Sequence, residues 1–456
     1  MLYGYYLNYP CILCKRLYKL NRNKNFGGVE MKKALSIFMM FVLLLGMLAA
    51  CGPKEEEETK DNSGDTGSEE AAKPEKLIVW EDIDKAVALE DAAKKFEEEH
   101  GIKIEIKELN ITEMQENLAL DGNTENAPDV ITMSHDGVGP AVVKGYIKEL
   151  EVSDDVLGQY TESSVDALKY DGKLYGLPKA TETPVFIYNK DLLPEVPETM
   201  DELFETSKGV TKDGNYGFLA IWDDFYHAHG IFAGFGGYVF GDKDGTPDPT
   251  DIGLNNDAAV EAGEYINKWY AEGLFPSGII GEKSNDNMNG LFKEGKAIAV
   301  QNGPWAFKDY ADAGINYGVA ALPKLPNGEP VKTFMGVKGW FVTNFSENAD
   351  WAQKFVELIT NEENAQKRFE ITSEIPPLKT LMEDPEFVKN NEGAAAVMAQ
   401  SEHAVAMPSI PELAEVWDPM KNAVQTIVTG KSEVKPALDE AVNTIKQQIE
   451  ANHSGK

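Results

Sequence analysis

Apolar runs with strand spacing, separated by a segment of helical spacing, most constrain the fold of this chain. Residues 77–80 suit a buried strand, and residues 102–106 alternate apolar and charged side chains as in a half-buried strand. Between them, residues 89–96 carry apolar side chains at helical spacing, and Gly101 follows where a helix would end. Residues 130–133 form another apolar run. This order predicts an α/β protein with parallel strands and right-handed crossovers.

The length and composition allow several such units. The chain has 456 residues, and domains of about 100–200 residues would give two to four. Further amphipathic helices are expected at 258–272, 351–360 and 434–451, and short strands at 185–188 and 297–300. The net charge of −33 argues against nucleic acid or an anionic membrane surface as a general partner.

The N-terminal segment has the pattern of an export signal. Two lysines after Met31 precede an apolar stretch that ends in Leu-Ala-Ala before Cys51, which resembles a bacterial lipobox. We therefore expect residues 1–30 to be an untranslated upstream extension, 31–50 a lipoprotein signal peptide and 51–75 a flexible acidic tether. Lipid on Cys51 would anchor the protein to the cell membrane on its extracytoplasmic face, in a Gram-positive bacterium. A short transmembrane anchor is the alternative, and would leave the protein on the same face.

Metal and catalytic motifs are sparse. All three cysteines lie within the first 51 residues, which excludes a cysteine nucleophile or cysteine-bound zinc from the body. Residues 242–250 mimic part of a calcium loop, but Gly253 stands where a glutamate is needed, so a hairpin or surface loop is expected. We expect no metal or cofactor. Paired carboxylates leave a glycoside hydrolase open as the enzyme alternative.

Polar and aromatic side chains recur where predicted strands end. In parallel sheets ligands bind beyond these ends. Carboxylates accept hydrogen bonds from hydroxyl groups, a lysine donates them, and flat rings cover apolar faces, so this mixture suits a neutral polyhydroxylated ligand. Taken singly, a tryptophan is more often a core residue and an Asp-Lys pair a solvated helix start. The residues are Asp84, Lys85, Asp136, Glu182, Asp224, Tyr226, Trp305 and Trp417.

Several short motifs carry a family resemblance. They are IYNKDLLP at 187–194, QNGPWA at 301–306, NYGV at 316–319 and MPSIP at 407–411. With them, the chain from about Lys76 to Glu450 resembles the maltose/maltodextrin-binding proteins, the extracytoplasmic solute-binding subunits of ABC importers. The resemblance implies a two-lobed periplasmic-binding-protein-like fold. Each lobe is then a mainly parallel sheet flanked by helices, with a ligand cleft between the lobes. Residues 76–182 and 338–385 would form the first lobe, and 183–337 and 386–456 the second.

The resemblance also implies which residues bind sugar. They are Asp84, Lys85, Asp136, Glu182, Asp224, Tyr226, Trp305, Met407, Trp417 and Lys421. Trp340 is either a replacement ring in the cleft or a buried core residue.

The chain departs from the family pattern at several of these places. Met133 stands where a stacking tryptophan is common, and Gly137 where an arginine binds. Further replacements relative to the family pattern are Asp224 and Gln115 in place of glutamates, His227 in place of an aromatic residue, Asp418 in place of a tyrosine and Lys421 in place of an arginine. The oligosaccharide class survives these changes, but the linkage and chain length are left open.

The expected function is therefore capture of maltose/maltodextrin-type oligosaccharides by hinge closure, and delivery to ABC transporter permease subunits. We expect a monomer with no catalysis. The alternatives are a binder of another oligosaccharide, such as a galacto-oligosaccharide or cyclodextrin, the glycoside hydrolase, and a purely structural lipoprotein.

Overall fold

The computed structural model describes residues 73–243 and 246–453 of the chain. The expected upstream extension, signal peptide, most of the tether and the lipidation site Cys51 lie outside the described residues. Within the described ranges, no helix has both the length and the apolar character that a membrane span requires.

The first sheet contains the predicted strand–helix–strand unit. The strands are β1 (Lys76–Asp82) and β2 (Lys103–Leu109), which pair in parallel, and β3 (Val130–Ser134), which pairs in parallel on the other side of β1. Between β1 and β2 lies α2 (Glu90–His100), which ends at Gly101 with a φ of 62°. These elements confirm the sequence prediction, including the glycine at the helix end.

The longest strand of the first sheet comes from much later in the chain. Strand β13 (Phe334–Val342) pairs antiparallel with β3 and with β6 (Gly176–Glu182), and in parallel with β14 (Val405–Ala406). The other elements of this region are η2 (Ala86–Leu89), η3 (Ile111–Glu113), α3 (Met114–Asp121), η4 (His135–Gly137), α4 (Val138–Val143), α5 (Asp154–Leu157), α6 (Glu162–Asp166), β4 (Lys169–Tyr170), β5 (Lys173–Leu174), α12 (Ala349–Thr360), α13 (Glu362–Thr372) and α14 (Lys379–Met382).

The second sheet has the order β12 (Tyr317–Ala320), β7 (Val185–Asn189), β11 (Ala297–Asn302) and β8 (Tyr216–Leu219). Strand β7 is antiparallel to both of its neighbours, and β11 and β8 are parallel. Both sheets are thus mixed, and the expectation of mainly parallel sheets is corrected. The pattern of apolar residues indicates which strands are buried, but it carries no information on their direction.

Helices cover the second sheet and share its core. They are α7 (Met200–Val210), α8 (Phe225–Phe235), α9 (Asp257–Ala271), α10 (Ser284–Lys293), α11 (Phe307–Asp312), α15 (Pro385–Asn390), α16 (Glu392–Ser401), α17 (Trp417–Val428) and α18 (Val434–His453), with short η5 (Ser277–Ile279), η6 (Pro304–Ala306) and η7 (Pro411–Glu415). The predicted helices at 258–272, 351–360 and 434–451 correspond to α9, α12 and α18. The expected hairpin at 242–250 is β9 (Gly241–Lys243) with β10 (Thr246–Asp248).

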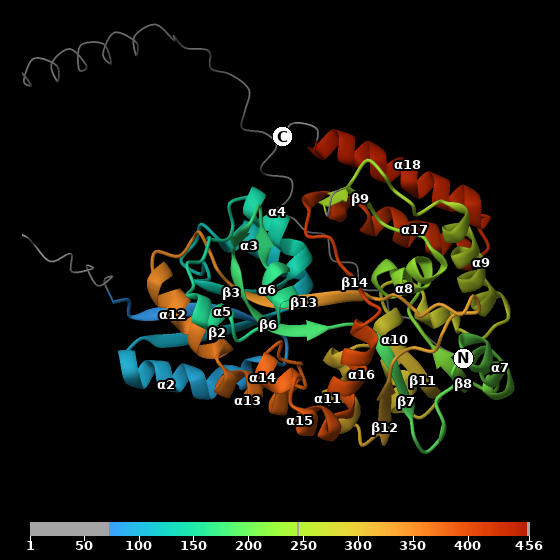
Figure 1. The fold of residues 1–456 in the computed structure, drawn as a ribbon, viewed down its shortest axis with the longest axis horizontal. Coiled ribbons are helices and arrows are strands. Elements are labelled where there is room, and N and C mark those ends of the chain that lie inside the picture. The colour runs from blue at the N-terminus through green and yellow to red at the C-terminus, as the bar shows by residue number, and fades with distance from the viewer. Residues whose placement is uncertain (1–72, 244–245, 454–456) are drawn as a thin grey trace, which may run out of the picture. The chain divides into compact units, whose positions relative to one another are not determined.

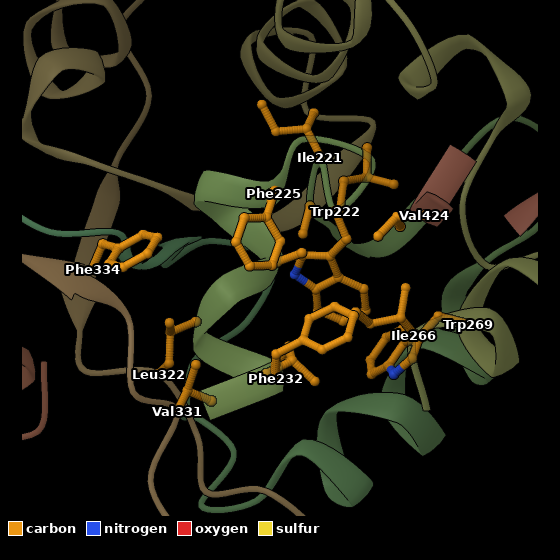
Figure 2. Close-up of a cluster of buried hydrophobic side chains, with 14 of the residues drawn as sticks. Ile221, Trp222, Phe225, Phe232, Ile266, Trp269, Leu322, Val331, Phe334 and Val424 are labelled. Atoms are coloured by element: carbon orange, nitrogen blue, oxygen red, sulfur yellow. The ribbon is translucent and has the colours of Figure 1, made fainter. Parts of the chain in front are cut away.

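Trp222 lies at the centre of the second core. Its indole is fully buried, with ring centroids of Trp269 at 5.6 Å and of Phe218 at 6.0 Å, and its Nε1 donates a 2.6 Å hydrogen bond to Gln301. Figure 2 shows Trp222 with Phe225 on one side and Trp269 on the other. Because Trp222 is anchored in this way, the loop that follows it and the start of α8 are held in a fixed place.

The chain passes between the two sheets through segments that are hydrogen-bonded to each other. Strands β6 and β13 lie side by side in Figure 1, and the chain continues from β6 through Thr183 into β7. The hydroxyl of Thr183 lies 2.7 Å from that of Thr333 and donates to the carbonyl of Phe334 at 2.8 Å. The imidazole of His135 accepts from the Val337 N–H through Nδ1, so its Nε2 donates to the Met407 carbonyl at 3.1 Å.

Helix α8 packs closely against the start of β13. The imidazole of His229 stacks on Phe334 with centroids 3.5 Å apart and planes inclined by 11°. A Cβ on Gly230 would lie 2.7 Å from the Val331 side chain, so the close approach depends on glycine. Burial lowers the pKa of His229 to about 3, although a hydrogen bond to the Lys332 backbone opposes this shift. His229 is therefore neutral in the folded protein at ordinary pH.

His229 is expected to make the protein less stable in mild acid. The unfolded histidine takes up a proton below pH about 6.5, while the folded one resists it down to about 3. Its contribution to the free energy of unfolding is therefore lost as pH falls through this window, at up to about 1.4 kcal/mol per pH unit. We expect His229→Phe to flatten the pH dependence of urea unfolding between pH 6 and 4.5 by about this slope.

The exposed His403 provides the control, because His403→Phe makes the same exchange of side chains at the surface, away from the buried stack on Phe334. Equal slopes for His229→Phe and the wild type would show that His229 titrates normally in the folded state.

Candidate ligand-binding site

A pocket of about 860 Å³ lies between elements of the two sheets. Its size is within the range of small-molecule sites, about 300–1,000 Å³. The residues that line it are Asp82, Asn110, Ile111, Thr112, Met114, Gln115, Met133, Ser134, Asp136, Gly137, Glu182, Ile221, Asp224, Phe225, Tyr226, His227, Asn285, Trp305, Gly336, Lys338, Met407, Trp417, Asp418 and Lys421.

The structure brings most of the sequence-predicted site residues to this one pocket. They come from five separate stretches of the chain: η4 after β3, the end of β6, the start of α8, η6, and the segment from β14 to α17. The members are Asp136, Glu182, Asp224, Tyr226, Trp305, Met407, Trp417 and Lys421. Their role in binding a ligand stays a prediction.

Asp84, Lys85 and Trp340 are not among the lining residues. Strand β1 extends to Asp82, and the carboxylate of Asp82 lines the pocket. Asp84 lies in the turn that follows, where it is exposed and has a φ of 62°. Lys85 is buried, and its charge acts on Glu374 in the first core. Trp340 is fully buried, with the Lys179 ammonium 4.9 Å from its ring. Of the two readings of Trp340, the structure supports the core residue.

Aromatic rings form one wall of the pocket. Trp305 follows β11 in η6 and is half-buried, with the ring of Tyr226 at 6.2 Å and that of His227 at 6.2 Å. Its indole lies across Gly303, where a Cβ would be 2.1 Å from the ring. Trp417 opens α17 and packs edge-on to Phe334 at 6.0 Å. Neighbouring rings therefore fix the position of each indole, while part of the Trp305 ring stays accessible from the pocket.

Polar groups of the pocket are unevenly satisfied. The hydroxyl of Tyr226 is buried and has no hydrogen-bond partner among the described residues. Burial raises its pKa well above the ordinary value, and the carboxylates of Glu182 and Asp136 add to the rise. Burial likewise raises the pKa of Asp136, opposed by His135. Asp224 accepts from the Tyr226 N–H at 2.9 Å and so caps α8. The Tyr226 hydroxyl is thus left unpaired in a residue that lines the pocket.

Three of the expected departures from the family pattern, on elements in or next to the first sheet, contact one another in the pocket lining. The amide of Gln115 donates to the Gly137 carbonyl at 3.1 Å and contacts the sulfur of Met133 at 3.6 Å. A Cβ on Gly137 would lie 2.5 Å from the Gln115 Nε2. Gln115 therefore occupies the space that a side chain at 137 would need.

A buried network of charges reaches the pocket between the two sheets. Lys338 on β13 pairs with Glu182 at 3.0 Å and with Glu374 at 3.4 Å, and Lys179 on β6 pairs with Glu81 at 2.6 Å and with Glu374 at 3.4 Å. All of these side chains are at least 86 % buried, since the most exposed, Glu182, is at 14%. The charges must therefore satisfy one another.

The pKa shifts follow from this network. Burial would lower the pKa of Lys338, but the carboxylates of Glu182 and Glu374 outweigh it and raise the pKa. Burial would raise the pKa of Glu374, and the ammonium groups of Lys179 and Lys338 reverse this. Both Lys338 and Glu374 are thus charged in the folded protein.

Sequence reasoning did not select Asp82, Asn110, Asn285 and Lys338, which also line the pocket. Asp82 had the same signal as Asp84, a carboxylate at the end of a strand. Lys338 had a different one, a lysine within the apolar run of β13. Asn110 directly follows β2 and so had the strand-end signal as well, whereas no such signal marks Asn285 in α10. Within the described parts of the chain, no cluster of residues could hold a metal ion.

Comparison with known proteins identifies the family. Residues 91–396 match the family model described as bacterial extracellular solute-binding protein. The chain belongs to this family. The match confirms the expected class, a solute-binding protein and not an enzyme.

Named relatives of this solute-binding protein extend over almost the whole chain. The galactooligosaccharide-binding protein of Bacillus subtilis is 44% identical over 94% of this chain and 100% of its own. A maltooligosaccharide ABC transporter solute-binding lipoprotein of Streptococcus pneumoniae is 34% identical over 91% and 98%. The crystal structure of a cyclo/maltodextrin-binding protein complexed with maltotetraose matches with a TM-score of 0.73 and 41% identity, over 84% of this chain and 100% of that chain. The periplasmic-binding-protein fold expected from the sequence is confirmed.

Lys338 is expected to be essential for the stability of this solute-binding protein. Lys338→Met would leave Glu182 and Glu374 buried without the Lys338 ammonium that pairs with both. The free energy of unfolding should therefore fall by about 3–5 kcal/mol. Urea unfolding without sugar should show this loss. Lys421→Met is the matched control, because Lys421 also lines the pocket but is half-buried, and its loss should cost less than about 1 kcal/mol. Equal stability of the two variants would mean that Lys338 does not hold the network together.

Proposed function

We propose that this protein binds a neutral oligosaccharide and delivers it to the permease of an ABC importer. The observation that carries the proposal is one pocket that the rings of Tyr226, Trp305 and Trp417 line together with the carboxylates of Asp136 and Glu182. Rings that cover apolar sugar faces and carboxylates that accept from hydroxyl groups together suit a carbohydrate.

The charge of the pocket favours a neutral ligand. Among its described lining residues the carboxylates outnumber the lysines, and Lys338 is already paired with Glu182. A sugar acid would bring a further negative charge into a half-buried site that has Lys421 as its remaining cation. Acidic saccharides should therefore bind more weakly than neutral ones of the same size.

Two sugar classes are candidates. The relative at 44% identity supports a galacto-oligosaccharide, and so does the first-sheet wall, where Met133 and Gly137 replace the indole and guanidinium of the maltodextrin pattern. The structure at 41% identity that holds maltotetraose, together with the sequence motifs, supports a maltodextrin. We place the galacto-oligosaccharide first because it is supported both by a relative that aligns with 94% of this chain and by residues of the chain's own pocket.

The mechanism we propose is closure of two lobes on the sugar, residues 76–182 with 338–385 and 183–337 with 386–456. The pocket has lining residues on both sheets, so a ligand that touches both sides binds the closed arrangement more tightly and shifts the population toward it. The lipid on Cys51, in accordance with the lipoprotein relative, would hold the protein on the extracytoplasmic face of the cell membrane near the permease.

A thermal-shift series tests the proposed ligand. We expect β-1,4-galactotriose or maltotriose to raise the melting temperature, because ligand at 100 times its dissociation constant adds about 2.7 kcal/mol to stability. Glucuronic acid-containing oligosaccharides of the same size should raise the melting temperature less, and no new reducing ends should appear on incubation. If no neutral oligosaccharide shifts the melting temperature, the carbohydrate assignment is wrong. Release of reducing ends would instead support the hydrolase.

Trp305 is expected to contribute to affinity and not to stability. Its ring would exclude water from about 60 Å² of sugar surface, worth about 1.5 kcal/mol or roughly tenfold in affinity. Trp305→Ala should therefore bind the sugar about tenfold more weakly in calorimetry, with the sugar-free melting temperature nearly unchanged. Trp340→Ala is the control, because loss of this core ring should cost about 3–5 kcal/mol of stability. A large drop in stability for Trp305→Ala, with normal affinity, would make Trp305 a structural residue.

A further inference from the structure

His227 lines the pocket and carries a buried polar atom that is unsatisfied. It lies in the first turn of α8, is 7% exposed and lines the pocket, yet its Nδ1 is buried with no hydrogen-bond partner among the described residues. The backbone around it is well held, because its N–H donates to Asp224 at 3.1 Å and its carbonyl accepts from Gln301 at 3.0 Å. The orphaned atom is therefore a feature of the side chain and not of a loose segment.

A buried polar atom without a partner destabilises a protein, so native structures seldom keep one without a reason. His229, two residues on, gives a comparison. Its Nδ1 also lacks a partner, but its ring is stacked on Phe334 and does not line the pocket. The two histidines differ in what can reach them: a ligand in the pocket can meet His227 but not His229.

The ring of His227 is also fixed beside the aromatic wall. It stands edge-on to Tyr226 at 5.3 Å and to Trp305 at 6.2 Å, with interplanar angles of 85° and 77°. Burial lowers the pKa of His227, opposed by the Asp224 carboxylate, so the imidazole is neutral and each ring nitrogen can either donate or accept. A sugar ring that covers Trp305 would bring its hydroxyl groups to this imidazole.

We propose that the Nδ1 of His227 forms a direct hydrogen bond with a hydroxyl group of the bound oligosaccharide and that His227 is a specificity-determining residue. This inference rests on the proposed function. A phenyl ring at this place would offer only an apolar edge, whereas a buried imidazole discriminates against sugars that lack the bonded hydroxyl, because its nitrogen would then stay unpaired.

Two substitutions test this inference in the full chain, with whichever of β-1,4-galactotriose and maltotriose binds the wild type. His227→Phe keeps a ring but removes the polar atom, and should weaken binding by about tenfold in calorimetry. Its sugar-free melting temperature should equal or exceed that of the wild type, because an unpaired buried polar atom has been removed. His227→Asn retains a polar atom at the place of Nδ1 and should bind more tightly than His227→Phe. His403→Phe, at an exposed histidine outside the pocket, should change neither property.

A series of monodeoxy sugars identifies the hydrogen bond itself. For the wild type, the analogue that lacks the bonded hydroxyl group should have a lower affinity than the parent sugar. For His227→Phe, this analogue and the parent sugar should have the same affinity. Unchanged affinity of His227→Phe for a sugar that the wild type binds would overturn the inference and leave the proposed function intact. The inference would also be overturned if His227→Phe had a lower melting temperature but normal affinity. An equal loss of sugar affinity in His227→Phe and His227→Asn would overturn it as well. A wild type that binds no neutral oligosaccharide would instead contradict the proposed function.

Discussion

The pairing of β6 with β13, and the buried charges that this pairing brings together, is the constraint on which the pocket depends. Lys179 stands on β6 and Lys338 on β13, and both ammonium groups meet Glu374 from the segment after α13. Neither lysine can turn toward water, since both side chains are at most 5% exposed. The network therefore fixes the register of the two strands at the place where each leaves the first sheet for the second.

The same strands carry groups into the pocket. Glu182 is the last residue of β6, and its carboxylate is held by Lys338. His135 ties the loop before Asp136 to β13 and to Met407 through its two ring nitrogens. A ligand in the pocket therefore meets side chains whose positions are set by the segments that join the two sheets.

Much of the fold could be predicted because local periodicity reports burial. The apolar run of β1, the helical spacing of α2 and the glycine that ends it appear where the pattern placed them. The antiparallel direction of β7 relative to its neighbours could not be predicted, because the pattern of apolar residues is the same for a parallel and an antiparallel strand. Trp305 and Trp340 show a similar limit for side chains, because the sequence does not tell a pocket ring from a core ring. Trp305 follows strand β11 and Trp340 lies within β13, and only the packing of Lys179 against Trp340 assigns the Trp340 ring to the core.

For the site, the predicted carboxylates and rings do meet in one pocket, except where the strand end was misplaced. The sequence marked Asp84 and Lys85, whereas β1 continues to Asp82 and the following turn directs Lys85 into the charged core. A shift of two residues decides which carboxylate reaches the pocket, and residue spacing alone does not resolve it. Asn285 reaches the pocket from α10, which no strand-end rule covers.

The interlocking of Gln115 with Gly137 has a consequence for how such a pocket can change during evolution. Because any side chain at 137 would collide with the Gln115 amide, an arginine there is accessible only after position 115 has changed or moved. A smaller residue at 115 would in turn leave the Gly137 carbonyl without its donor. The two positions are thus coupled, because a side chain at 137 displaces the end of the Gln115 side chain and so breaks its hydrogen bond to the Gly137 carbonyl.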